Sequence, residues 1–318
     1  MARSADSKPV RNGRSWPVGI AVVAFAVLDV ALVALAFGAV NAPIAASAPT
    51  STAWMDESPV PTASPTPVPA MAPTVAPTRI LAALNSEVAW RSTTGSCPEA
   101  EAQPELSTDA GATWQPTDAS GPTGVTALQS IDISSSALAS FIGFDASDCS
   151  PQYVRTFVGG DNYSTYNDEI EGSWYFVPNG ALHAPGADVA TPCESIVSLA
   201  SRSDDEAAAL CADGSVHITA DRATSWVDAP ARESTLAIAD IDGGYVLALA
   251  GSLECAGVQL VFVDRLGETV TKGCQPLETE AADLAGTVAI AATDGTVWLW
   301  AGDVVAQSSD RGLSWSRR

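Results

Sequence analysis

Basic residues and histidine are scarce in this chain of 318 residues. Its 15 Lys and Arg stand against 37 Asp and Glu, which gives a formal net charge of −22, and only two histidines are present. A surface this acidic repels nucleic acid and anionic lipid, so neither is an expected partner. Neither His183 nor His217 stands in an HExxH or GxSxG context, and we expect both at the surface or at a strand edge.

CxxC pairs are also missing, and no cluster of Cys and His has the spacing of a metal site. We therefore expect no metal and no cofactor. The six cysteines all follow residue 96, and their even number fits an oxidising compartment and three disulfides. Fifteen pairings are possible, and sequence order favours Cys97–Cys149, Cys193–Cys211 and Cys255–Cys274.

The longest apolar run of the chain lies near its N-terminus. Residues 17–40 carry a single charge, Asp29, and are long enough to cross a hydrocarbon core of about 30 Å. Basic residues precede this run and none directly follows it, which predicts a cytoplasmic tail over 1–16 and a transmembrane helix over 17–40. We expect a single-pass cell-membrane protein with its C-terminal part extracytoplasmic. The alternative is a long signal peptide that is cleaved after the run.

Residues 41–78 form a segment with almost nothing that could build a core. Nine prolines and ten Ser or Thr fall between residues 42 and 78, which predicts a disordered, extended linker. From Arg79 onward short runs rich in Val, Ile, Ala and aromatic residues alternate with Gly, Asp, Asn and Ser turns. Such a pattern predicts an all-β domain over 79–318.

An eight-residue motif recurs in this β domain. It reads STDAGATW at 107–114, TADRATSW at 219–226 and SSDRGLSW at 308–315, while NDEIEGSW at 167–174 keeps only the Ser-Trp end. The motif positions are Ser107, Asp109, Gly111 and Trp114; Thr219, Asp221 and Trp226; and Ser308, Asp310, Gly312 and Trp315.

These copies resemble the Asp-box, the bacterial neuraminidase repeat of sialidases, sortilin-type receptors and other β-propellers. The resemblance implies a propeller whose boxes lie away from any catalytic centre. Turn chemistry agrees, because Ser and Asp side chains can accept the amide hydrogens of their own turn and Gly permits a positive φ. We therefore expect the boxes to be structural.

The spacing of the motif tryptophans predicts the number of blades. Gaps of 60, 52 and 89 residues are compatible with about five four-stranded blades, because a blade usually takes 40–50 residues. The predicted blade ends are Pro116, Pro178, Pro230, Pro276 and Arg318. The last strand ends the chain and the first blade starts at Arg79, so the ring should close without exchanging a strand.

A sialidase-like site finds little support in the residues. The resemblance implies a clamp of three arginines with a Tyr–Glu pair and an Arg-Ile-Pro motif, but here Arg79 and Ile80 are followed by Leu. A clamp of Arg91, Arg155 and Arg265 has no motif behind it, so we assign no catalytic residue. The DIDGG stretch with Asp240 resembles part of a calcium loop but lacks its other ligands, and we expect a plain turn.

The stretch 159–176 is the most unusual part of the domain, because it mixes aromatic residues with carboxylates. Its candidate ligand-binding residues are Asp161, Tyr163, Tyr166, Asp168, Glu169, Glu171 and Trp174. The alternative is a solvated loop whose aromatic residues pack on a neighbouring blade. The sequence thus predicts a non-enzymatic binding or scaffolding module for a protein or glycan ligand on a bacterial membrane anchor, with a divergent sialidase-like glycoside hydrolase as the alternative.

Overall fold

The computed structural model describes residues 72–178, 180–230, 234–293 and 295–318. The chain divides into two compact units, Met1–Pro65 and Thr66–Arg318, and every described residue belongs to the second. The predicted tail, the predicted membrane span with Asp29, and most of the predicted linker lie outside the described residues. Within the described ranges, no helix has the length and apolar character needed to cross a membrane.

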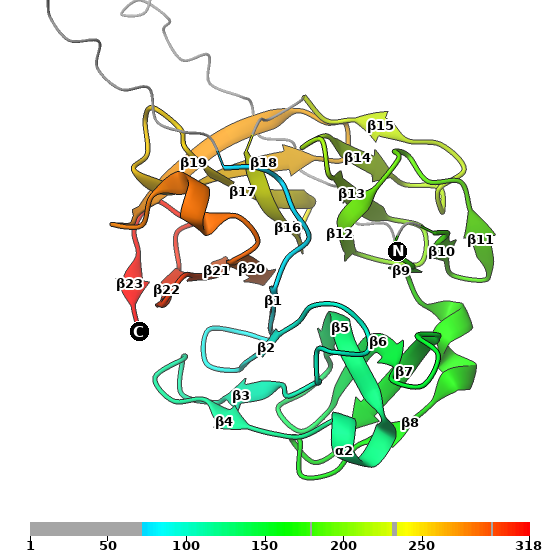
Figure 1. The fold of residues 1–318 in the computed structure, drawn as a ribbon. Helices are drawn as coiled ribbons and strands as arrows, with labels where there is room; N and C mark the ends of the chain where they lie inside the picture. The colour runs from blue at the N-terminus through cyan, green and yellow to red at the C-terminus, as the bar shows by residue number, and fades with distance from the viewer. Residues whose placement is uncertain (1–71, 179, 231–233, 294) are drawn as a thin grey trace, which may run out of the picture. The chain divides into compact units, whose positions relative to one another are not determined.

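Six antiparallel sheets follow one another along the chain and form the blades of a β-propeller (Figure 1). Blade 1 holds β1 (Arg79–Ala83), β2 (Ala89–Thr93), β3 (Glu105–Ser107) and β4 (Gln115–Pro116). Blade 2 follows a short helix α2 (Ser120–Thr123) and holds β5 (Val125–Ile133), β6 (Ala139–Asp145), β7 (Pro151–Thr156) and β8 (Ser164–Thr165). Blade 3 follows the 3-10 helix η1 (Asn167–Gly172) and has only β9 (Tyr175–Phe176), β10 (Leu182–Ala184) and β11 (Ala187–Val189).

The second half of the ring has the regular four strands in every blade. Blade 4 holds β12 (Ile196–Ser201), β13 (Ala207–Cys211), β14 (Val216–Thr219) and β15 (Val227–Asp228). Blade 5 holds β16 (Thr235–Ile241), β17 (Gly244–Ala250), β18 (Gly257–Asp264) and β19 (Thr269–Pro276). The 3-10 helix η2 (Ala281–Leu284) leads to blade 6, with β20 (Val288–Thr293), β21 (Thr296–Ala301), β22 (Val304–Ser308) and β23 (Ser316–Arg317).

The predicted all-β propeller is confirmed, but the expected number of about five blades is wrong, because the ring has six. The predicted second and third blades, 117–178 and 179–230, contain three sheets. Blade 3 escapes sequence reasoning because its strands are only two or three residues long. The weak motif copy at 167–174 misled the count as well, since residues Asn167–Gly172 form a 3-10 helix and not a box turn.

Apolar side chains between the blades form the core of the ring. Five clusters of buried residues join blades 1 and 2, blades 3 and 4, blades 4 and 5, blades 5 and 6, and blades 6 and 1. The interface of blades 1 and 2, for example, packs Trp90 against Phe141 edge to face at 5.5 Å. Because each sheet must bury both faces, every blade depends on its two neighbours.

The ring closes between blades 1 and 6 through side chains, and each of these sheets is built from its own consecutive strands, as predicted. Trp298 packs edge to face on Trp114 and donates from Nε1 to the Asn85 carbonyl. The buried Gln307 donates from Nε2 to the carbonyls of Ser86 and Ala110. Blade 6 is thus fastened to the loops of blade 1.

The interface between blades 2 and 3 is different from the others. Among the described residues, no cluster of buried apolar side chains joins these two blades. Gln129 joins them instead, because its Nε2 donates to the Phe176 carbonyl and its Oε1 accepts from the Phe176 amide. An irregularity in the pairing of β5 with β6, between Thr126 and Ser130, accompanies this arrangement. One side-chain amide therefore takes the place of a hydrophobic core.

The two faces of the ring have different features. The turns between third and fourth strands share one face, here the turn face, with the hairpins between first and second strands, as the bond from Ala110 N to Glu87 O indicates. The opposite face carries the three predicted disulfides, Cys97–Cys149, Cys193–Cys211 and Cys255–Cys274, which the structure confirms. Residues 72–78 reach the ring on this second face, where Thr78 N donates to Gly286 O.

Replacing Gln307 should weaken the ring at its closure. Gln307→Leu removes the donor to the carbonyls of Ser86 and Ala110 and the acceptor of Arg318. Three hydrogen bonds of this kind contribute about 2 kcal/mol in total. Urea unfolding should register this loss in the free energy of unfolding. Gln103→Leu, at an exposed position, is the matched control and should change little. Equal stability of the two variants would contradict the assigned role of Gln307.

Candidate functional site

Each of the three box motifs forms the turn between the third and fourth strands of its blade. In the blade 6 turn Ser308 Oγ accepts from Gly312 N at 2.6 Å, and Asp310 accepts from the amide and hydroxyl of Ser314 at 2.8 and 2.6 Å. The turns of blades 1 and 4 repeat this pattern through Asp109 and Asp221. These carboxylates thus bind groups of their own turns.

The hydrogen bonds of the turns lower the pKa values of their carboxyl groups. The hydroxyl of Ser314 is the largest cause at Asp310, whose pKa falls to about 2. The hydroxyls of Thr113 and Ser225 lower the pKa of Asp109 and of Asp221 in the same way. A carboxyl group held so firmly in its ionised form is poorly suited to general acid–base chemistry near neutral pH.

The blade 4 turn differs from the two complete copies at one position. Trp114 and Trp315 donate from Nε1 to the carbonyls of Gly111 and Gly312, both at 3.1 Å. Blade 4 has Ala223 at the glycine position, with φ 59°, and the buried Nε1 of Trp226 has no hydrogen-bond partner. Ala223 therefore adopts a left-handed conformation that penalises a side chain.

Blade 2 carries a fourth turn of the same geometry, which sequence reasoning missed. Thr156 Oγ1 accepts from Gly160 N at 3.0 Å, and Gly159 N donates to Ala137 O as Ala110 N does to Glu87 O in blade 1. The segment 156–163 has Val158 where the other turns have Asp, and Tyr163 where they have Trp. The pattern Thr-x-x-x-Gly-x-x-Tyr could have indicated this turn in the sequence, but it lacks the Asp that defines the motif.

Ala223→Gly should stabilise the protein by about 0.5–1 kcal/mol, because the relief of left-handed strain exceeds the entropy that glycine adds to the unfolded chain. The opposite change is the matched control. Gly312→Ala introduces a Cβ at φ 87° and 2.8 Å from Leu260 Cδ1, so it should destabilise. Denaturant unfolding of both variants checks the pair, and a loss of stability in Ala223→Gly would contradict the assigned geometry.

The pKa of Asp310 predicts a pH dependence of stability. Its folded pKa of about 2 lies below that of an unfolded Asp, about 3.9, so the carboxylate contributes stability that is present above about pH 4 and lost as the pH falls through about 2. Asp310→Asn should lower stability at neutral pH and flatten the acid limb of the stability curve. Asp303→Asn, at an exposed acid outside the boxes, should leave that limb unchanged when unfolding is measured from pH 7 to 2.

The candidate loop separates into buried and exposed members. Tyr163 is 3 % exposed and hydrogen-bonded to Thr117 Oγ1, and burial raises its pKa to about 12. Trp174 is 6 % exposed and donates to the Ser203 carbonyl. Both belong to the packing between blades, so neither offers its ring to a ligand. Tyr166 is half-buried, while the four acids of the loop, Asp161, Asp168, Glu169 and Glu171, are exposed.

The exposed part of the loop joins a cluster on blade 2 around Arg155. The guanidinium bonds to the hydroxyl of Tyr153 at 2.8 Å, which raises the pKa of Arg155, and forms an ion pair with Glu169 at 3.2 Å. It also lies 5.2, 5.8 and 5.5 Å from the ring centroids of Tyr153, Phe157 and Tyr166. Residues 153, 155 and 157 alternate along the chain, and that period of two was the sequence signal for one shared surface.

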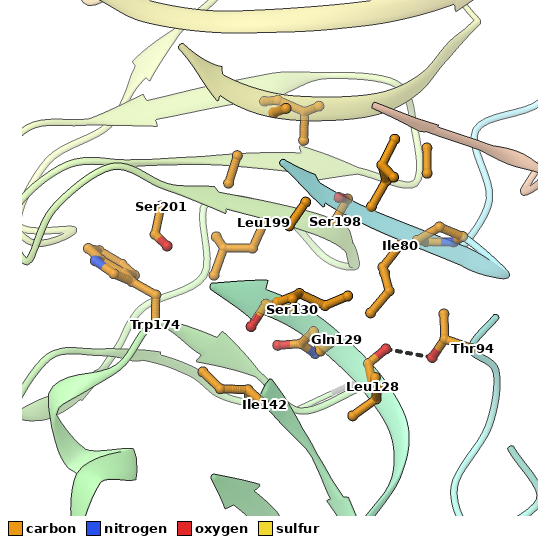
Figure 2. A pocket seen from close by; sticks show the side chains of 18 of the residues that line it. Ile80, Thr94, Leu128, Gln129, Ser130, Ile142, Trp174, Ser198, Leu199 and Ser201 are labelled. Carbon is orange, nitrogen blue, oxygen red and sulfur yellow. Dashed lines mark hydrogen bonds between the residues drawn. The ribbon is translucent and has the colours of Figure 1, made fainter. Parts of the chain in front are cut away.

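A cavity of about 720 Å³ lies at the centre of the ring and reaches this cluster. Its central part is lined mainly by small and apolar side chains of the first strands, and Figure 2 shows Ile80, Ser130, Ser198 and Leu199 there. Its outer part runs between blades 2 and 3, where Ile142, Phe144, Tyr153, Trp174 and Phe176 line it. The missing core at this interface and the cavity are therefore the same feature.

Three acids line the central part of the cavity. They are Asp132, Asp204 and Asp240, and Asp240 is reached by solvent although surrounding protein desolvates its carboxyl and raises its pKa. The DIDGG stretch forms the β16–β17 hairpin turn with Gly243 at φ 83°, as expected. The described residues bring no further ligand to it that would make a calcium loop.

The arginines considered for a sialidase-like clamp do not converge. Arg91 binds Glu105 and lies over the rings of Trp114 and Trp300 in the closure of the ring. Arg155 is on blade 2, and Arg265 pairs with Glu206 at 3.2 Å in blades 5 and 4. Of the described arginines, the cavity is lined by Arg79 and Arg202 alone. The geometry of a three-arginine site is therefore absent from the described part of the ring.

The two histidines have structural partners. His183 is buried, which corrects the expected surface position, and its ring nitrogens lie 2.9 Å from Asp188 Oδ1 and 3.2 Å from the Glu171 carbonyl. His217 is half-buried and contacts Asp228 and Ser215. The sulfurs of Cys193 and Cys211 lie near His217, but they form a disulfide and so cannot ligate a metal.

Comparison with known proteins finds solved structures only. No family model and no curated protein matches the chain. A structure of YCF48 bound to a D1 peptide is 17 % identical, covering 78 % of this chain and 82 % of that one, with a TM-score of 0.40. The SapL1 lectin with α-methyl fucoside is 10 % identical, covering 79 % and 96 %, with a TM-score of 0.44. Trypanosoma rangeli sialidase with 2,3-difluorosialic acid is 11 % identical, covering 78 % and 56 %, with a TM-score of 0.41. At these values each is similar to this chain in fold alone.

Proposed function

We propose that this chain is a non-enzymatic binding module of the cell surface. Its ligand lies in the outer part of the cavity, between blades 2 and 3, which we call the groove. The observation that carries the proposal is the missing core at this interface. It leaves a cavity that reaches from the centre of the ring to the aromatic cluster at Arg155. A preformed cavity whose walls combine apolar side chains with a few polar groups is typical of a binding site.

We further infer that the three box turns are Asp-boxes with a structural role. Support comes from Asp109, Asp221 and Asp310, whose oxygens accept hydrogen bonds within their own turns. The turns hold the ends of third strands and leave the groove to other residues. The boxes would thus stabilise the scaffold on which the ligand site is built.

The proposal includes the anchor over residues 17–40, the linker over 41–78 and an extracytoplasmic position of the propeller. Three disulfides support an oxidising compartment. The entering segment 72–78 lies on the face opposite the box turns. A protein or a glycan outside the membrane is the expected partner class.

Turnover separates this proposal from the alternative, a sialidase-like glycoside hydrolase. The full-length chain, with its disulfides formed, would be incubated with sialosides, other glycosides and cell-wall polysaccharide, and released sugar quantified. We expect no release, because Arg91, Arg155 and Arg265 lie apart with separate partners. Release that disappears in Asp168→Asn or Glu169→Gln would overturn the proposal and make the ring an enzyme.

A further inference from the structure

The outer end of the groove is framed by side chains that form one continuous surface. Tyr153 lines the cavity and bonds to Arg155, and Arg155 in turn lies against Phe157 and Tyr166. The rings of Phe157 and Tyr166 meet edge to face at 5.9 Å. A ligand in the groove would therefore pass from the apolar wall directly onto these rings.

The box-like turn of blade 2 exposes apolar side chains at this point. Phe157 is 49 % exposed and Val158 is 51 % exposed, whereas the corresponding pairs of the other turns are polar or small residues followed by Asp. Val158 gives up the carboxylate hydrogen bonds that stabilise the other three turns. A residue that breaks a local rule and exposes apolar surface is a feature of interaction sites.

The charges around this surface favour a cationic partner. Its four exposed acids are Asp161, Asp168, Glu169 and Glu171, and the one nearby base, Arg155, is paired with Glu169. At the central end of the cavity three acids, Asp132, Asp204 and Asp240, stand against two bases, Arg79 and Arg202, so the acids are in excess there too. Such a field attracts cations and repels anions. The aromatic rings already contact one guanidinium, that of Arg155, in a cation–π arrangement.

The walls of the groove favour a polypeptide over a sugar. Ile142 and Phe144 line the groove with apolar side chains, although both are largely buried, and Gln129 already uses both ends of its amide on Phe176. A sugar needs many directional polar partners, while an extended peptide gains from apolar contact and from charge at the rim.

We propose that the groove between blades 2 and 3 binds an extended segment of a partner protein in which an apolar side chain is flanked by Lys or Arg. The apolar side chain contacts Phe157, Val158 and the groove wall, and the flanking cations face the acids of residues 161–171. This inference rests on the proposed binding function and names the chemistry of its partner.

Fluorescence anisotropy on the full-length chain tests the inference with short labelled synthetic peptides. One carries a Phe between Lys and Arg residues, a second has Glu in place of the bases, and a third has Ala in place of Phe. We expect only the first to bind, with an affinity that falls as salt is added. Phe157→Ser and Val158→Asn should each weaken binding by about tenfold, as loss of a central apolar contact does.

Matched variants serve as controls for loss of the fold and for the effect of charge. Val158→Asn removes the apolar side chain but supplies an oxygen that can accept within the turn, so the fold is retained. Asp161→Asn with Asp168→Asn should also weaken binding, whereas Leu253→Ser, at a side chain 84 % exposed on blade 5, and the exposed Glu278→Gln should not.

The outcomes separate this inference from the proposed function. Equal binding of the acidic peptide, or no effect of Phe157→Ser and Val158→Asn, would overturn the inference. Binding of a cell-wall oligosaccharide that depends on Phe157 and Tyr153, with no peptide binding, would leave the binding function standing and overturn the peptide partner. Sugar release by the wild-type chain would overturn both.

Discussion

The packing of one blade on the next is the constraint on which this propeller depends. Each sheet is too small to bury its own faces, so stability comes from side chains that fill the interfaces around the ring. Large aromatic side chains fill the interface of blades 1 and 6. Trp298 packs on Trp114 there, and the guanidinium groups of Arg79 and Arg91 lie over Trp300. Together with the hydrogen bonds of Gln307 to Ser86 and Ala110, these contacts join the first and last blades without an exchanged strand.

The same constraint explains why the interface of blades 2 and 3 becomes a groove. Blade 3 has three short strands and lacks the fourth that the other blades have, so it offers little apolar surface to blade 2. Gln129 keeps the two blades in register by bonding to both backbone groups of Phe176, a contact that holds position without filling space. The apolar face of blade 2, with Ile142 and Phe144, therefore lines a cavity and does not pack fully on a partner sheet.

The features that could be predicted from the sequence were those that depend on neighbouring residues or on simple order. The geometry of a box turn depends on a few neighbouring residues, such as Ser308, Asp310 and Gly312, so the motif predicts it. The three disulfides join cysteines that follow one another in the chain. Blade 3 could not be counted, because strands of two or three residues have no period to detect. The cluster at Arg155 depends on which face of β7 points outward and on η1 bringing Glu169 to it, and neither is written in the motif spacing.

The blade 2 turn shows how a scaffold element and an interaction surface can share one geometry. In blades 1, 4 and 6 the acid of the box binds its own turn and leaves nothing for a ligand. In blade 2 the bond from Gly160 N to Thr156 Oγ1 retains the shape of the turn without the acid, and Tyr163 stands at the position of the Trp and is buried there. The position vacated by the acid is then free to carry Val158 outward beside Phe157. The loss of the motif at this one turn, more than its presence at the other three, therefore indicates where a ligand would bind.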